Sequence, residues 1–329
     1  ELPAQIIAAV VSRVKSLGRM DVAEKRRPQD GRLKTRTPEG NEVELRLSSL
    51  PTANGEKMVM RVFDPEILLK SFSELGLANE DYRQWEGLVE NSNGIVLVTG
   101  PTGSGKTTTL YSAISELNKI EDKIITTEDP VEYDIDGIIQ VPINPDVGVT
   151  FASCLRAILR QDPDKILVGE IRDLETGEIA VQASLTGHLV FSTLHTNDAP
   201  GTITRMKDMG IPTFMITATV EAILAQRLVR RICNHCREEI EASEELMAQL
   251  DLTPADLKER TLYRGSGCDH CNNTGYRGRV GLFELMIMND DIRELIMSNA
   301  STDELRKRAE HFGMVTLRSA GMQTMWDGV

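Results

Sequence analysis

Aromatic residues and long apolar runs are both scarce in this chain. Phe, Trp and Tyr make up 4% of its 329 residues, which leaves few rings on which the bases of a single-stranded nucleic acid can stack. No apolar run approaches the roughly 20 residues that span a bilayer, and no signal-like segment opens the sequence. We therefore expect a soluble chain that does not bind nucleic acid.

Positive charge is also in deficit. The chain carries 37 Lys and Arg against 50 Asp and Glu, a net charge of −13, and this balance opposes long-range attraction to phosphate backbones or anionic lipid. The length allows one large domain or two to three ordinary ones. Because the sequence begins with Glu1 rather than Met, we expect it to be part of a longer protein.

Cysteine is rare, yet four of the five cysteines form two CxxC pairs, Cys233-Asn-His-Cys236 and Cys268-Asp-His-Cys271. In a chain without export signals, this pattern favours metal binding over structural disulfides and indicates a reducing cytosol. We predict a closed tetrahedral Zn²⁺ site of four thiolates that contributes folding energy. The alternative is two redox-active or merely buried pairs.

Three further residues near these motifs have simpler expected roles. His235 and His270 lie inside the CxxC pairs, where the geometry for ligation is poor, and we expect them to be exposed. Cys154 lies in a helical stretch and is predicted to be a small core residue.

The spacing of apolar residues predicts an α/β chain. Residues 1–65 combine a helix-like opening with alternating apolar stretches at 42–51 and 57–64, separated by turn chemistry at Pro28–Gly31 and Asn54-Gly55. This region predicts a small, incomplete α+β domain, followed by a linker at 66–76. From Ala199 onward the pattern is mostly helical, with helices expected at Ser243–Leu250 and Pro254–Arg260.

The middle of the chain alternates between strand and helix patterns. Because such alternation implies a parallel sheet, ligands are expected at the carboxyl ends of the strands. Asp173 and Gly187 are the expected cap and stop of the last of these helices. The predicted strands are Ile95–Thr99, Lys123–Thr127, Lys165–Gly169 and Leu189–Thr193, and the predicted helices are Thr107–Leu117, Phe151–Gln161 and Leu174–Leu185.

A phosphate-binding loop follows the first of these strands. The stretch GPTGSGKT satisfies GxxxxGK[ST] between a strand and a helix. Its glycines let backbone N–H groups converge on a phosphate, and the helix adds its positive end. Lys106 is expected to neutralise β- and γ-oxygens and Thr107 to hold Mg²⁺; the alternative is a turn that matches by chance. The predicted nucleotide-binding residues are Gly100, Thr102, Gly103, Ser104, Gly105, Lys106, Thr107 and Thr108.

Acidic residues follow two other predicted strands. Phosphoryl transfer also needs metal placement and water activation. The stretch ITTEDPVEY supplies Glu128, Asp129 and Glu132, and KILVGEIRD supplies Glu170. Both groups are expected to open toward one crevice. The alternative is a solvated charged loop.

Histidines and arginines surround these acids. His188 and His195 flank a short apolar strand in TGHLVFSTLHTND; one of them can donate to a γ-phosphate, and the alternative is a packed or capping role. Three arginines lie near the acidic segments: Arg156, Arg160 and Arg172. We expect them either to form surface ion pairs or to insert into a neighbouring subunit, where they would stabilise transition-state charge.

These motifs occur in the order found in the secretion-ATPase superfamily. The chain resembles its type II secretion and type IV pilus assembly branches through GPTGSGKTTTLY, TTEDPVEY, ILVGEIRD and TGHLVFSTLHTNDA, and the resemblance runs from Glu1 to Val329. Two departures exist. ILVGEIRD lacks the Asp that usually precedes its Glu, and the family carries further N-terminal strands and a short C-terminal tail.

The resemblance implies an α/β fold with a RecA-like P-loop NTPase core at 77–231. It also implies a partial N-terminal α+β (PAS-like) domain at 1–65, a zinc-binding insert at 232–275 and a mostly helical subdomain at 276–329. Members are cytoplasmic homo-hexamers at the inner face of the inner membrane. They use ATP, Mg²⁺ and structural Zn²⁺, and they associate with the membrane only through the cytoplasmic domains of platform proteins.

The resemblance also implies residue roles. Glu128 would orient or deprotonate the attacking water, Glu170 would act through the metal, and His188 and His195 would be the histidine-box pair. Arg46 and Arg61 are similar to arginines of the N-terminal domain that reach over the nucleotide; they would couple domain rotation to its state.

We predict an ATP-hydrolysing motor subunit for pseudopilus assembly and protein export in type II secretion. The alternative is a type IV pilus assembly ATPase, since both branches carry the tetracysteine insert. A nucleic-acid motor, suggested by Arg227, Arg230 and Arg231, conflicts with the net charge. A GTPase is suggested by NKIED at Asn118, which lies in the wrong place for base reading. A passive nucleotide-binding adaptor is the last alternative.

Overall fold

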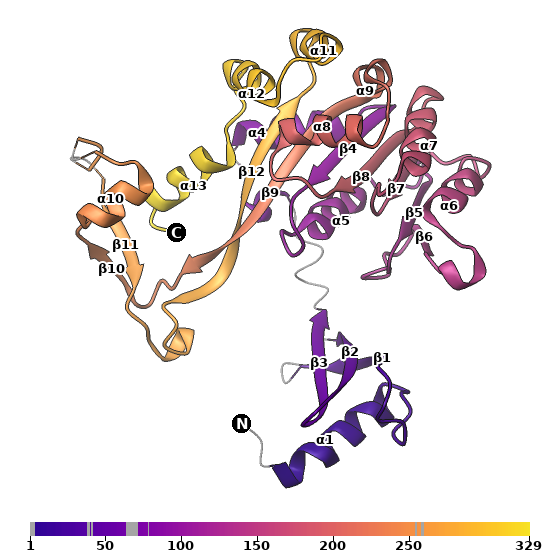
Figure 1. The fold of residues 1–329 in the computed structure, drawn as a ribbon, viewed down its shortest axis with the longest axis vertical. Helices are drawn as coiled ribbons and strands as arrows, with labels where there is room; N and C mark the ends of the chain where they lie inside the picture. The colour runs from indigo at the N-terminus through magenta and orange to yellow at the C-terminus, as the bar shows by residue number, and fades with distance from the viewer. Residues whose placement is uncertain are drawn as a thin grey trace. The chain divides into compact units, whose positions relative to one another are not determined.

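The computed structural model describes residues 4–37, 40, 42–63, 72–77, 79–253, 255–257 and 260–329. The chain forms two compact units (Figure 1). The smaller unit consists of residues 1–69 with 132–134, and the larger unit of residues 70–131 with 135–329. Among the described residues, no helix combines the length and the apolar character needed to cross a membrane.

The smaller unit pairs one helix with an antiparallel sheet. Helix α1 (Ala4–Leu17) precedes strands β1 (Gln29–Arg36), β2 (Glu42–Thr52) and β3 (Gly55–Phe63), which lie in the order β1-β2-β3. The predicted turn at Asn54-Gly55 is confirmed, because Thr52 pairs with Gly55 in the β2/β3 hairpin. The turn predicted at Pro28–Gly31 is wrong, since β1 already begins at Gln29. Gly31 instead permits close approach, because a Cβ there would lie 2.5 Å from the Gly18 carbonyl oxygen.

A seven-stranded sheet forms the centre of the larger unit, in the order β12-β9-β4-β8-β7-β5-β6. Strand β12 is antiparallel to β9, and the other neighbours are parallel. The four strands predicted in the middle of the chain are confirmed. The strands of this sheet are β4 (Gly94–Thr99), β5 (Ile124–Glu128), β6 (Ile139–Pro142), β7 (Lys165–Val168), β8 (Leu189–Leu194), β9 (Val220–Ile232) and β12 (Tyr276–Ile287).

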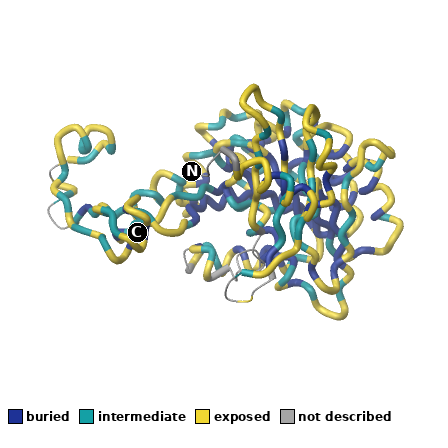
Figure 2. Tube along the Cα trace, turned by 90° about the horizontal axis from the view of Figure 1, so that it is seen from below, coloured by how far each residue is buried: buried dark blue, intermediate teal, exposed yellow. Residues whose placement is uncertain are grey.

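The expectation of a mostly helical chain after Ala199 is wrong for β9 and β12. The first half of β9 and the second half of β12 are buried. A buried strand reads as a continuous apolar run, and periodicity alone does not separate such a run from a buried helix. Strand β12, antiparallel to β9, makes the sheet mixed, where a parallel sheet was expected. Figure 2 shows the buried strands as a dark blue band through the larger unit.

Helices cover both faces of this sheet. Alternate residues of β4, Ile95 and Leu97, belong to a core cluster shared with α6–α9, α11 and α12, whereas α5 contacts β4 separately. Asp173 caps α7 as predicted, accepting from the Thr176 N–H at 2.8 Å. The helices are α3 (Phe72–Leu75), α4 (Asn79–Val89), α5 (Lys106–Glu116), α6 (Phe151–Ile158), α7 (Leu174–Leu185), α8 (Ala199–Asp208), α9 (Thr213–Thr219), α11 (Asp290–Met297), α12 (Thr302–His311) and α13 (Leu317–Trp326).

The cysteine-bearing segment lies between β9 and β12. Strands β10 (Arg237–Ile240) and β11 (Leu262–Gly265) form a two-stranded antiparallel sheet, and α10 (Glu244–Leu250) confirms the first predicted helix. Of the second, Pro254–Arg260, residues 254, 258 and 259 lie outside the described residues, and 255–257 form a turn. Hereafter "the insert" denotes residues 233–271.

Candidate active site

The predicted acids and the phosphate loop lie along one edge of the sheet. Strand β4 ends at Thr99, just before the loop, and pairs in parallel with β8, which ends just before His195. Strand β8 pairs with β7, and β7 with β5. Since carboxyl ends of parallel strands meet at the same edge, the loop, His195, Glu170 and Glu128 are brought together there.

The phosphate loop leads into α5, and the first N–H groups of a helix lack partners within it. Gly103 and Gly105 have φ of +79° and +93°, and Gly105 caps α5 without any side-chain hydrogen bond. The Ser104 hydroxyl is buried and has no hydrogen-bond partner among the described residues. A Cβ at Gly100 would lie 2.4 Å from the Gln226 carbonyl oxygen, so only glycine fits. This arrangement suits an anion at the start of α5.

The Lys106 ammonium group lies against the loop itself. Its Nζ donates to the carbonyl oxygens of Gly100 at 2.8 Å and Pro101 at 3.2 Å, and lies 3.4 Å from His195 Nδ1. Burial lowers the pKa of Lys106, while Glu170 opposes that shift and Arg227 adds to it. A nearby anion would therefore stabilise its charged form.

Glu170 is the centre of a chain of contacts at this edge. Its Oε1 lies 3.3 Å from His195 Nε2, and its Oε2 accepts from Arg172 Nε at 2.7 Å. Arg172 also reaches Asp129 Oδ2 at 3.4 Å, and the hydrogen bond to Glu170 is the largest cause that raises the pKa of Arg172. The two acidic segments expected to share a crevice are thus joined by one arginine.

Glu128 is placed differently, because its carboxylate is buried and already accepts protein hydrogen bonds. The donors are the Tyr111 hydroxyl at 2.5 Å, the Thr126 hydroxyl at 2.5 Å and Gln140 Nε2 at 3.1 Å. Tyr111 and Gln140 were not predicted as site residues, because no local pattern in the sequence marks them as partners of an acid at the end of a strand. A role for Glu128 in orienting water stays a prediction.

His188 does not join the other site residues in this chain. It directly precedes β8, whereas His195 directly follows it, so the two lie at opposite ends of one strand. The His188 Nδ1 atom lies 2.9 Å from the Ala183 carbonyl oxygen and 3.1 Å from the Thr186 hydroxyl, at the end of α7. This geometry corresponds to the capping alternative and gives no support to a catalytic role in the same chain.

The remaining predicted arginines have other partners or neighbours within their own units. Arg156 on α6 pairs with Glu175 at 2.6 Å, and Arg160 is exposed just beyond α6. In the smaller unit, Arg46 and Arg61 are direct cross-strand partners in β2 and β3. Arg46 also forms an ion pair with Glu132 of the same unit at 2.8 Å.

Buried threonines and a glutamine hold the phosphate loop in place. The Thr99 hydroxyl accepts from the Thr196 N–H at 2.9 Å, which ties the end of β4 to the segment after β8 that contains His195. The Thr109 hydroxyl donates to Gln226 Oε1 at 2.8 Å, which ties α5 to β9. The sequence offers no signal for these pairs, because they join segments far apart in the chain.

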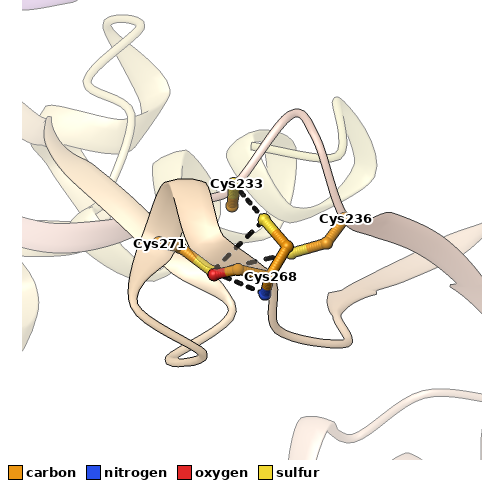
Figure 3. Close-up of side chains that lie close together, drawn as sticks. All are labelled: Cys233, Cys236, Cys268 and Cys271. Atoms are coloured by element: carbon orange, nitrogen blue, oxygen red, sulfur yellow. Dashed lines mark hydrogen bonds between the residues drawn. The ribbon is translucent and has the colours of Figure 1, made fainter.

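The four predicted metal ligands converge (Figure 3). All four sulfur atoms lie within 4.8 Å of one another, with Cys233–Cys268 at 3.9 Å and Cys236–Cys271 at 3.8 Å. Four thiolates around one Zn²⁺ at about 2.3 Å are separated by about 3.8 Å, so the cluster fits that ion. Burial opposes thiolate formation at Cys271, but N–H donors from Cys268 and Gly275 and the other thiols lower its pKa to about 6.

The other residues near the cysteine motifs behave as expected. His235 and His270 are exposed, and their rings stack with centroids 3.9 Å apart, so neither points its nitrogen into the cluster of sulfur atoms. Cys154 is buried in the core cluster, as predicted.

Comparison with known proteins agrees with this geometry. A family model described as "Type II/IV secretion system protein" matches residues 1–329. The type IV pilus assembly ATPase TfpB of Acinetobacter baylyi is 49% identical over 328 residues, which cover 100% of this chain and 56% of that protein. The type II secretion system ATPase E of Vibrio cholerae is 48% identical over 328 residues, covering 99% of this chain and 64% of that protein. The chain thus spans less than two thirds of either relative.

Solved structures show the same fold. The pilus retraction motor PilT with bound ADP is 30% identical, with a TM-score of 0.59 over 95% of this chain and 79% of that chain. The Legionella pneumophila ATPase DotB is 23% identical, with a TM-score of 0.65 over 92% of this chain and 74% of that chain. With a family model that matches its whole length, the chain belongs to the type II/IV secretion system protein family.

Proposed function

We propose that this chain is the ATP-hydrolysing part of a motor subunit that drives assembly of a pilus-like filament. The observation that carries the proposal is the line of contacts from Lys106 through His195 to Glu170, next to the start of α5. Phosphoryl transfer needs a cation for the terminal phosphate, a carboxylate and a hydrogen-bonding group within one site. These three groups are in contact here.

The roles follow from the contacts. ATP phosphates would replace the carbonyl oxygens of Gly100 and Pro101 as partners of the Lys106 ammonium group, and would accept from the uncapped N–H groups of α5. Thr107 and Glu170 would hold Mg²⁺, which supplies charge neutralisation at the phosphates. Glu170 would thus act through the metal, Glu128 would orient or deprotonate the attacking water, and His195 would sense whether a terminal phosphate is present.

We further propose that the site is completed in a homo-hexamer. Arg156 and Arg160 are exposed on the larger unit, and an exposed arginine can reach a neighbour's nucleotide and spread transition-state charge. Arg46 and Arg61 share one face of the β2/β3 hairpin and would contact the nucleotide in only some positions of the smaller unit. A ligand shifts such an equilibrium only by differential contacts, so ATP hydrolysis would drive the domain motion.

Type II secretion remains our first choice of machine, with pilus assembly as the second. Relatives from both systems are almost equally similar, at 49% for the pilus ATPase of A. baylyi and 48% for the secretion ATPase of V. cholerae. In either system we propose a place at the cytoplasmic face of the inner membrane, reached through platform proteins. Restoring secretion, or alternatively piliation, in strains that lack the respective native ATPase would separate the two.

Glu170→Gln tests the enzymatic proposal. The neutral amide keeps the volume of the side chain but removes the charge, so we expect ATP to bind while turnover falls about 100-fold or more. Glu178→Gln on α7 changes an exposed glutamate away from the edge and is the matched control. Hydrolysis by Glu170→Gln at the rate of that control would overturn the assigned role.

A further inference from the structure

One buried carboxylate connects the starts of two helices in the larger unit. Glu284 in β12 is 3% exposed. Its Oε1 accepts from the Ala199 N–H at 2.7 Å, and its Oε2 accepts from the Leu317 N–H at 3.0 Å. Ala199 and Leu317 are the first residues of α8 and α13. The first N–H groups of a helix lack internal partners and form its positive end, so each helix start stabilises the same negative charge.

The α8 end of this connection leads to the phosphate site. The segment between β8 and α8 is only His195 to Asp198. Thr196 is tied to Thr99, the residue before the phosphate loop, at 2.9 Å. Asp198 caps α8 through the Gly201 N–H at 2.7 Å. Because the link is so short, we expect displacement of the start of α8 to shift His195.

The α13 end leads to the insert. Arg318, in the first turn of α13, donates to the Leu250 carbonyl oxygen at 3.0 Å and pairs with Asp251 at 2.8 Å, both at the end of α10. Beyond the other end of α13, Arg237 donates to the Gly328 carbonyl oxygen at 3.0 Å. Figure 1 shows α13 in yellow between the β9/β12 pair and α10.

The surroundings of Glu284 leave room for movement. A cleft of about 690 Å³ lies beside it, lined by residues of β9, β12, α12 and α13. Arg306 on α12 is held by Asp198 at 2.9 Å, so the charges nearest Glu284 already form a pair. At the start of α13, Leu317 packs against the core cluster, and the Glu284 carboxylate adds a hydrogen bond at the same residue.

We propose that Glu284 is a positioning residue that couples the insert to His195. A force on the insert, or a partner bound to it, would then change the position of His195 at the phosphate site. The role of this coupling in the motor rests on the proposed function, whereas the experiment that tests the coupling does not. A carboxylate is required because it offers two equivalent acceptor oxygens. In Glu284→Gln one oxygen becomes an NH₂ group, which faces an N–H donor and releases one of the two helix starts.

Amide hydrogen exchange of the full chain tests the coupling without any need for turnover. Arg318→Ala cuts the contact between α13 and α10, and we expect exchange at residues 195–201 to accelerate about fivefold or more, the range of ordinary coupling energies. In a Glu284→Gln background, Arg318→Ala should no longer change exchange there. Arg308→Ala is the matched control, because it breaks an exposed ion pair, at 2.7 Å, between Arg308 on α12 and Asp291 on α11.

The outcomes are distinct. If Arg318→Ala leaves 195–201 unchanged, or accelerates exchange there equally with Glu284 and with Gln at that position, the coupling does not exist. Arg318→Ala in the otherwise native chain gives this answer alone should Glu284→Gln fail to fold. If the native chain does not hydrolyse ATP, the proposed function fails while the exchange result still decides the coupling. If the native chain does hydrolyse ATP, Arg318→Ala should change kcat more than KM.

Discussion

His195 Nε2 lies 3.3 Å from Glu170 Oε1, while the other histidine of the same motif lies at the far end of β8. His188 contacts the Ala183 carbonyl oxygen there at 2.9 Å. The strand between them therefore separates two residues that the sequence had paired. Only His195 lies beside Lys106 and Glu170 in its own chain.

This separation predicts unequal effects of two matched substitutions. His195→Ala removes the group between Lys106 and Glu170, and we expect kcat to fall about 100-fold. His188→Ala removes only a cap of α7, so we expect a loss of stability of about 1 kcal/mol with a kcat change below about threefold. Steady-state phosphate release with thermal unfolding of each variant measures both. A larger kcat loss for His188→Ala would reverse the assignment, or place that residue in a neighbour's site.

Mixed oligomers distinguish arginines that act in a neighbouring subunit. Arg156 pairs with Glu175 in its own chain, so its proposed catalytic role requires a second copy. Arg156→Ala and Glu170→Gln should each be nearly inactive, but an equal mixture should form roughly one complete site in four and regain activity. Lys106→Ala mixed with Glu170→Gln should regain none, because those two residues serve the same site. Equal results from both mixtures would contradict a role between subunits.

Zinc binding at the cysteine cluster should stabilise the fold, and its loss should lower stability before it lowers the rate of ATP hydrolysis. We expect one Zn²⁺ per chain by metal analysis, and a Tm lowered by roughly 5 °C or more in Cys271→Ser or after chelation. His270→Ala removes an exposed ring inside the same motif and should keep the metal. Purified native protein free of zinc would end the assignment, and zinc loss in His270→Ala would make that histidine a ligand.

Glu284 gives the fold a defined pH dependence. Burial raises the pKa of its carboxyl above the usual range, and the N–H groups of Ala199 and Leu317 oppose the rise. The folded chain then holds this proton to higher pH than the unfolded chain. The resulting stability is present below the unfolded pKa and lost as pH rises through the folded pKa. Glu284→Gln does not titrate, so its stability deficit against the native chain should shrink between about pH 4 and pH 7.

Urea unfolding of both proteins at the two pH values measures this difference. Gln182→Ala, at an exposed and uncharged position on α7, should show a deficit that stays constant over the same interval. A Glu284→Gln deficit that grows with pH would mean that the carboxylate is stabilised rather than penalised by its surroundings.

Local patterns in the sequence were sufficient for the phosphate loop, the central parallel strands and the cysteine pairs. Each depends on residues a few positions apart: glycines before Lys106, a cap at Asp173, two sulfur ligands in one turn. Strands β9 and β12 were missed, because a buried strand and a buried helix share the same apolar composition. Where the carboxyl ends lie was predictable, since parallel pairing places them at one edge.

The contacts that hold the site together were not predictable in this way. Thr99 with Thr196, Thr109 with Gln226, and Glu284 with Ala199 each join residues 85 or more positions apart. The second partner of Glu284, Leu317, lies 33 positions away. A polar residue inside a strand gives no local sign of its partner. Such pairs emerge only when the sheet order is known, and the sheet order depended on the two strands that were missed.

The central claim is that the loop at Lys106 hydrolyses ATP, and phosphate release by the native chain and by Lys106→Ala tests it most directly. Removal of the ammonium group leaves the terminal phosphate without its cation, so we expect the Mg²⁺-dependent rate to fall about 100-fold or more. Lys119→Ala, an exposed lysine beyond α5, should retain the native rate. Equal phosphate release by the native chain and Lys106→Ala would contradict hydrolysis at this site.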